Sequence, residues 1–204
     1  MKKVLMLSAA LLFSAAAYAH TAQPALKSPD TQKPATTQAP APPPFVDPST
    51  IRPKPRPNDV KSIDSIVDAV YDVISGPPGP RDWDRLKSLL LPEARFMPVA
   101  HRRDGQDAYR IITIDDYIER SGPMFMKEGF FETGIANRVE QFGSIAHVFS
   151  TYEARREKGG QPFIRGINSI QLVKLGDRWW IVSIMWDTER PGIAIPEKYQ
   201  KSSQ

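Results

Sequence analysis

The sequence predicts an α+β domain in which helices pack on one side of a curved antiparallel sheet, preceded by a disordered tail. Apolar residues recur at helical spacing from Val60 to Ile74, whereas after Gly129 the apolar residues alternate with polar ones, as in strands. The pattern ends in a hairpin over residues 166–188, where runs rich in Ile, Val and Trp flank a short turn. Helices first and a meander of strands second indicate helices segregated to one face of the sheet.

The first helix is expected over the apolar-periodic residues 60–74. Asn58 or Asp59 precedes this stretch and is suited to cap its amino end, and Gly76 followed by two prolines stops it. A second, shorter helix is expected after Asp82, and Pro92 ends it.

The third helix opens at Thr113, because Asp116 three residues later completes a variant of the capping box. Gly122-Pro123 is expected to break this helix. Between the second and third helices, residues 94–99 predict a short strand and residues 101–106 a polar loop.

The remaining strands are expected over residues 130–140 and 145–156 and in the final hairpin. Gly176-Asp177 separates the two hairpin strands, and a two-residue loop with Gly first suits a type II′ turn. That loop places Leu172 opposite Ile181 and Ile170 opposite Ser183. Both faces of the hairpin are then mostly apolar, so the helices cover one face, and a second subunit is the simplest cover for the other.

The amino-terminal part has a different composition. Lys2 and Lys3, an apolar run and an Ala-x-Ala site ending at Ala19 are typical of a secretory signal peptide over residues 1–19. Residues 20–57 are rich in Pro, Ala, Thr and Gln and predict a disordered, semi-rigid linker. The folded domain is expected over residues 58–199, followed by a tail over 200–204. Cleavage leaves no integral membrane segment, and the product is expected to be periplasmic or secreted.

Charge and cysteine content exclude several classes of function. The net charge is +4, of which residues 1–19 carry +2 and residues 20–57 carry +3, so the domain carries −1. A nucleic-acid-binding surface on the domain is therefore not expected. Without cysteine the chain has no disulfide, no thiolate chemistry and no lipoprotein acylation site.

Several segments resemble the nuclear transport factor 2-like superfamily, in particular its small bacterial SnoaL-like members and those similar to the calcium/calmodulin-kinase association domain. The resemblance lies in the first helix, in residues 86–96 (LKSLLLPEARF), 113–117 (TIDDY) and 145–154 (IAHVFSTYEA), and in the hairpin sequence GDRWWIV at 176–182. It implies a cone-like curved sheet whose concave face, closed by the helices, encloses an apolar pocket, and whose outer face commonly pairs with another subunit.

The resemblance also implies which hairpin residues face the pocket. Facing inward, near the pocket, are Asn168, Ser183, Met185 and Asp187. Facing a partner subunit are Trp180, Val182, Ile184 and Trp186. The aromatic residues Tyr117, Phe125 and Tyr152 are further candidates for the pocket lining, or alternatively core residues.

Candidate catalytic residues are few. Many small relatives carry a His near the end of the last strand, where this sequence has Met185, so Asp187 is the candidate base, or alternatively a solvated strand-end residue. His147 is a second candidate, or a hydrogen-bonded core or interface residue. The spacing of His20, His101 and His147 does not suit a metal site, and no cofactor is expected.

These observations predict an exported domain that binds a small apolar molecule or a protein partner and forms a homodimer. The alternative is a cofactor-free acid/base enzyme of the isomerase, dehydratase or hydrolase type. In that alternative Asp187 or His147 is the base and Tyr117 or Tyr152 the proton donor.

Overall fold

The computed structural model describes residues 45–102 and 104–200 of the chain. The expected signal peptide, most of the expected linker and residues 201–204 lie outside the described residues. The elements run in the order η1 (Pro48–Thr50), α1 (Pro57–Val60), α2 (Ile63–Ile74), α3 (Trp83–Leu89), β1 (Leu90–His101), β2 (Asp107–Tyr109), α4 (Ile114–Lys127), β3 (Phe131–Phe142), β4 (Ile145–Arg155), β5 (Pro162–Leu175), β6 (Arg178–Thr188) and η2 (Glu197–Tyr199).

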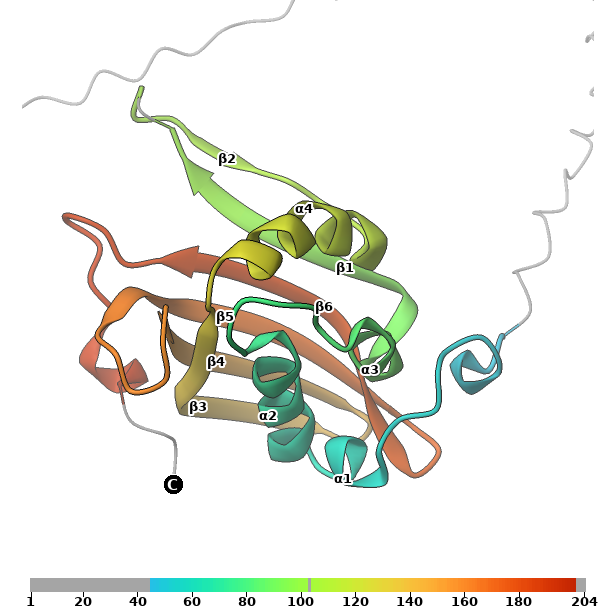
Figure 1. Ribbon diagram of the computed structural model, residues 1–204. Coiled ribbons are helices and arrows are strands. Elements are labelled where there is room, and N and C mark those ends of the chain that lie inside the picture. The colour runs from blue at the N-terminus through green and yellow to red at the C-terminus, as the bar shows by residue number, and fades with distance from the viewer. Residues whose placement is uncertain (1–44, 103, 201–204) are drawn as a thin grey trace, which may run out of the picture. The chain divides into compact units, whose positions relative to one another are not determined.

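The strands form one curved sheet with the order β2-β1-β6-β5-β4-β3, and helices α2, α3 and α4 lie on one face of it (Figure 1). The α+β class and the antiparallel meander from β3 to β6 are confirmed. The sheet as a whole is mixed, because β1 pairs with β6 in parallel. The core lies between the helices and the sheet and contains Ile66, Val67, Leu86, Ile170 and Ile181.

The helix ends differ from the prediction in two places. The expected first helix is interrupted: Ser62 starts α2 by accepting a hydrogen bond from the Ser65 N–H, so the helix is capped there and not at Asn58 or Asp59. Helix α4 does start at the Thr113 and Asp116 capping box, but it continues through Pro123 to Lys127.

A β-bulge in β6 changes which residues face the core. The expected pairing of Leu172 with Ile181 is confirmed, but the next residue of β5, Gln171, pairs with Ser183, so Val182 is an extra residue on β6. Side chains alternate along a strand, and one extra residue therefore inverts the faces beyond it. Ile184 and Trp186 face the helices, and the expectation that they form part of an outer subunit interface is wrong.

The outer face of the sheet is partly covered by the chain itself. The ring of Tyr199, in η2, packs on Phe149 with 4.9 Å between centroids, and Thr151 Oγ1 donates a hydrogen bond to the Tyr199 carbonyl. Trp180 is 1% exposed, and the Arg178 guanidinium lies 3.5 Å from its ring centroid. A second subunit is therefore not needed to cover this part of the face.

Contacts within the domain begin before the expected boundary at Asn58. Arg52, in the expected linker, donates hydrogen bonds to the carbonyls of Leu90 and Leu91. Within the described part of the chain, no helix has both the length and the apolar character that crossing a membrane requires.

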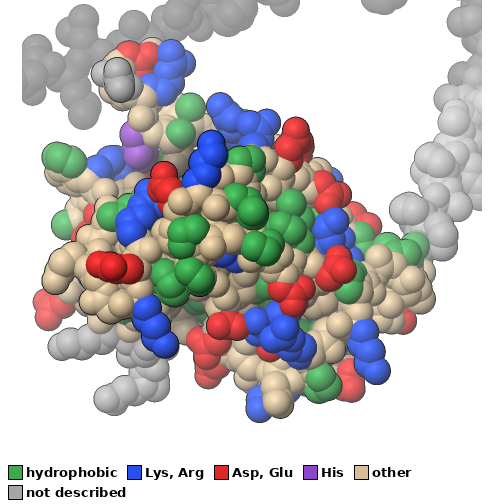
Figure 2. All heavy atoms as spheres, in the orientation of Figure 1, with side chains coloured by type: hydrophobic (Ala, Val, Ile, Leu, Met, Phe, Trp, Pro, Cys, Tyr) green, Lys and Arg blue, Asp and Glu red, His purple; other side chains and the backbone are tan. Residues whose placement is uncertain are grey.

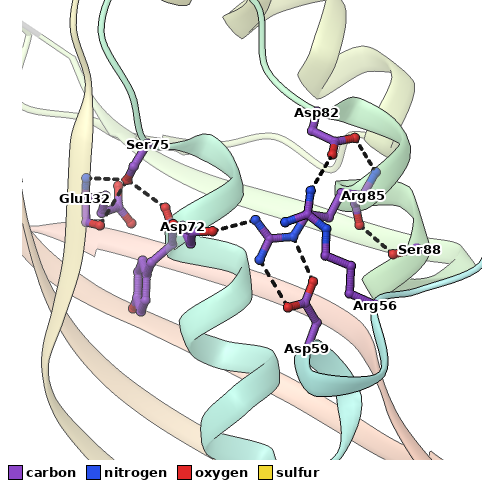
Figure 3. Close-up of polar contacts among 9 residues, drawn as sticks. Arg56, Asp59, Asp72, Ser75, Asp82, Arg85, Ser88 and Glu132 are labelled. Atoms are coloured by element: carbon purple, nitrogen blue, oxygen red, sulfur yellow. Dashed lines mark hydrogen bonds and ion pairs between the residues drawn. The ribbon is translucent and has the colours of Figure 1, made fainter.

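Arg85 of α3 joins the short helix α1 to α2, as Figure 3 shows. Its guanidinium contacts the two carboxylate oxygens of Asp59 at 2.7 and 3.1 Å and Asp72 at 2.5 Å. The Arg85 and Asp59 side chains are only 12% exposed, and a bidentate pair of this kind is stronger than a solvated one. This network fixes α2 and α3, which form one wall of the site.

Candidate functional site

A cavity of about 320 Å³ lies between the helices and the inner face of the sheet. Most of its wall is apolar, and several rings contribute to it: Phe96, Tyr117, Phe125, Phe130, Tyr152, Phe163 and Trp186. Figure 2 shows hydrophobic side chains gathered near the middle of the helix-covered face, with charged side chains around them. A concave, mainly apolar cavity with a few polar groups is typical of small-molecule sites.

The bulge decides which predicted residues line this cavity. Tyr117, Phe125, Tyr152 and Asn168 line it, as expected from the sequence. The other two expected ligand-binding residues, Ser183 and Met185, do not. They lie beyond Val182, where the faces are inverted, and Met185 is 44% exposed and lines a different hollow on the outer face.

Glu132 of β3 is the only acidic side chain among the described residues that line the cavity. It is held in place through its backbone: Ser75, the residue that ends α2, accepts a hydrogen bond from the Glu132 N–H at 2.9 Å (Figure 3). Burial raises the pKa of Glu132 to about 7, and the hydrogen bond from Asn168 only partly opposes this effect. The carboxyl therefore changes charge near neutral pH.

A short chain of hydrogen bonds surrounds this carboxyl. Asn168 Nδ2 donates to Glu132 Oε1 at 3.3 Å and to the Tyr71 hydroxyl at 3.1 Å. The Tyr71 hydroxyl also shares a 2.6 Å hydrogen bond with Ser150 Oγ. Asn168 thus uses both of its amide hydrogens to link β3, β5 and α2, and its orientation is fixed.

Three tyrosine hydroxyls lie within electrostatic reach of Glu132. Burial, and then the nearby Glu132 charge, raises the pKa of Tyr71, Tyr117 and Tyr152 above the usual value of 10. These hydroxyls stay protonated across the physiological range. They are therefore neutral groups that can donate hydrogen bonds.

Asp187, the expected base, lies outside the cavity in an ion-pair cluster. Its Oδ1 contacts His101 Nε2 at 2.7 Å, and Arg190 Nη1 donates to both of its oxygens at 3.0 Å. Burial favours a higher pKa for Asp187, but the hydrogen bonds from His101, the Thr188 N–H and Arg190 outweigh it and lower the pKa. A carboxylate stabilised in this way is a weak base, and Asp187 does not line the cavity.

His101, expected in a polar loop, is the last residue of β1 and lies between two carboxylates. Its Nδ1 contacts Asp107 Oδ1 at 2.6 Å, and its Nε2 contacts Asp187. The cluster joins the β1–β2 hairpin to the end of β6. The hydrogen bonds to Asp187 and then Asp107 raise the pKa of His101.

We therefore expect His101 to titrate above 6.5 in an NMR titration of the imidazole protons, and Asp187→Asn to lower its pKa. A raised histidine pKa stabilises the fold below the unfolded value of 6.5, and this contribution is lost as pH rises through the folded pKa. The destabilisation caused by Asp187→Asn should accordingly shrink at high pH. An unchanged His101 titration in the variant would show that the cluster does not form in solution.

His147 also lies outside the cavity. It belongs to the outward row of β4, where its Nε2 makes a 3.0 Å hydrogen bond with Ser169 Oγ and its ring packs edge-on against Phe149. This is the hydrogen-bonded environment that the sequence allowed as the alternative to catalysis. Among the residues that the structure describes, no group of three or more metal-ligating side chains is present.

Sequence reasoning missed Glu132, although its position carried a signal. Phe130, just before β3, alternates with Glu132 and Gly134 within it, so the Glu132 carboxylate falls on the same side as an aromatic residue that faces the core. Burying an acidic side chain among core-facing residues costs free energy of folding when no partner compensates its charge. The alternation of inward and outward residues along this strand could therefore have identified Glu132 as a candidate site residue.

No protein-family model and no curated protein matches the chain. Among solved structures, the chain is similar to a nuclear transport factor 2-like protein of unknown function from Silicibacter pomeroyi. The two are 15% identical, the match covers 62% of this chain and 92% of that chain, and the TM-score is 0.41. It is also similar to a protein of unknown function with a cystatin-like fold from Nostoc punctiforme (8% identity, 62% and 88% covered, TM-score 0.49). A third is the calcium/calmodulin-kinase II hub of S. rosetta (16% identity, 62% and 90% covered, TM-score 0.41).

The chain itself folds as an α+β domain with a curved, open sheet of six strands. Proteins that share one fold can have unrelated functions, and likenesses of 8–16% identity do not assign one. What the domain of this chain does is therefore argued from its own cavity.

Proposed function

We propose that the domain binds a small, mainly apolar molecule in the cavity, with one polar group of that molecule at Glu132. The observation that carries this proposal is an aromatic-walled cavity of about 320 Å³ containing a single carboxyl. Within the described part of the chain that carboxyl has no ion-pair partner and one long hydrogen bond, from Asn168 at 3.3 Å.

An enclosed carboxyl of this kind weakens the fold, which supports a functional role for it. Glu132 occupies a core-facing position where an apolar side chain would be more stable, and its raised pKa measures the cost of ionising it there. Positions at which a chain departs from the pattern of its own core are often functional sites.

Filling the cavity should abolish binding. Ser121 lines the wall on α4, and Ser121→Phe would place a ring in the space that the ligand needs. With 2-phenylethanol as a neutral probe, we expect calorimetry to show at least tenfold weaker binding to this variant, provided that circular dichroism shows an unchanged fold. Met185→Ala is the matched control, since Met185 lies on the outer face; an equal loss in the control would contradict the assignment of the cavity.

Proton transfer is a second candidate function, favoured by the pKa of about 7 of Glu132. A general base is most effective when its pKa lies near the working pH, and the hydroxyls of Tyr117 and Tyr152 are neutral donors on the same wall. The base-catalysed ring opening of 5-nitrobenzisoxazole reports such a group without requiring the natural substrate. We expect a rate that rises with pH through about 7 and falls at least tenfold in Glu132→Gln; equal rates in both proteins would exclude Glu132 as a base.

A second subunit on the outer face stays a prediction for the part that the carboxyl-terminal segment leaves open. Val182 is 37% and Met185 44% exposed there. Light scattering of the purified domain decides between a monomer and a dimer.

A further inference from the structure

We propose that the polar group of the ligand is a protonated amine that forms an ion pair with Glu132. The inference rests on the proposed function, because it names the class of molecule that the same cavity takes: an apolar body carrying an ammonium group. Three features of the site favour a cation over a neutral or an anionic group.

The first feature is the charge balance of the cavity. Among the described residues, Glu132 is in no salt bridge, and the one cationic side chain in the cavity wall, Arg156, is already paired with Glu128 at 2.6 Å. The nearby Arg81 does not line the cavity, and neutral groups occupy its hydrogen-bond donors. Its guanidinium donates hydrogen bonds to four backbone carbonyls, those of Ile74, Gly76, Pro77 and Gly79.

The second feature is the unused hydrogen-bonding capacity of the carboxyl. Within the part of the chain that the structure describes, Glu132 Oε1 accepts one long bond from Asn168, and Oε2 has no protein donor. An ionised carboxylate has about four acceptor sites, and an ammonium group brings three donors. The two groups complement each other in both charge and hydrogen-bond number.

The third feature is the aromatic wall. Phe130 lies just before β3, two residues ahead of Glu132, and the ring of Trp186 lines the same cavity. The face of an aromatic ring attracts a cation within about 6 Å of its centroid. A carboxylate combined with aromatic rings suits an alkylammonium group better than it suits a hydroxyl or a carboxylate.

The test compares three probes of one shape and different charge: 2-phenylethylamine, 2-phenylethanol and phenylacetate. Calorimetry is run on the full chain at pH 8, above the pKa of about 7 of Glu132. A charge-assisted hydrogen bond is worth roughly twice a neutral one, so the amine should bind about tenfold more tightly than the alcohol. Phenylacetate should bind most weakly, because its charge repels that of Glu132.

Glu132→Gln is the diagnostic variant, because it keeps the size of the side chain and removes its charge. It should weaken amine binding about tenfold and leave alcohol binding within about twofold. Alcohol binding as tight as amine binding in the unaltered domain would overturn the amine assignment while leaving the cavity as a binding site. Failure of all three probes to bind at millimolar concentration would instead overturn the proposed function. The comparison of probes needs no variant, so it decides even if Glu132→Gln does not fold.

Discussion

Replacing Glu132 with Gln should raise the free energy of unfolding at pH 8 by about 3 kcal/mol and change it little at pH 4. The folded pKa is about 7, whereas the unfolded value is 4.5. A pKa difference of about 2.5 units corresponds to about 3 kcal/mol. Because the folded state holds the proton more tightly, stability is greatest below the unfolded pKa and is lost as pH rises through 7. Gln mimics the protonated carboxyl and removes this loss.

Urea unfolding of both proteins between pH 4 and pH 8 measures the difference directly. The matched control is Glu140→Gln, an exposed glutamate on the same strand, which should not change the pH dependence. If the curves of the parent and Glu132→Gln stay parallel over this range, Glu132 does not ionise in an enclosed site.

The second large effect concerns the bulge at Val182. Ile184 is 5% exposed and faces the cavity and core, so Ile184→Ala should cost about 2–4 kcal/mol of stability. Met185, its neighbour, is 44% exposed on the outer face, and Met185→Ala should cost less than about 1 kcal/mol.

This pair of adjacent residues separates two registers of the same hairpin. Without the bulge, Met185 would face the core and Ile184 would face outward. Met185→Ala would then cause the larger loss of stability and Ile184→Ala the smaller one. Thermal or urea unfolding of the two variants under one condition is sufficient, and a larger loss for Met185→Ala would mean that the bulge is absent.

Local signals predicted much of this fold correctly. The turn at Gly176 was expected to be type II′, and Gly176 has a φ of 63°, while no other type of residue in the described chain has a positive φ. The capping box of Thr113 and Asp116 likewise forms as expected. Both features depend on residues within a few positions of each other, which is why sequence spacing can reveal them.

The errors arise from interactions over longer range. Nothing in the run from Arg178 to Thr188 indicates an extra residue at Val182, because a bulge is set by pairing across the sheet, and it moved Ser183 and Met185 out of the cavity. Asp187, one partner of His101, lies 86 residues away in the sequence, so residue spacing could not reveal this contact. Parallel pairing of β1 with β6 joins distant segments in the same way.

The candidate site was predicted in outline and not in its chemistry. Tyr117, Phe125, Tyr152 and Asn168 do line the cavity, because apolar periodicity places a residue on a face. The titratable group was sought among histidines and on the last strand, whereas Glu132 acquires its properties from burial between three strands and α2.

A titration of the Glu132 side-chain carboxyl by ¹³C NMR, on the domain without ligand, tests the central claim most directly. An enclosed, unpaired carboxyl in the cavity should titrate at about 7. A value close to the ordinary 4.5 would show that the carboxyl is solvated, and would remove the basis for the ligand site at Glu132.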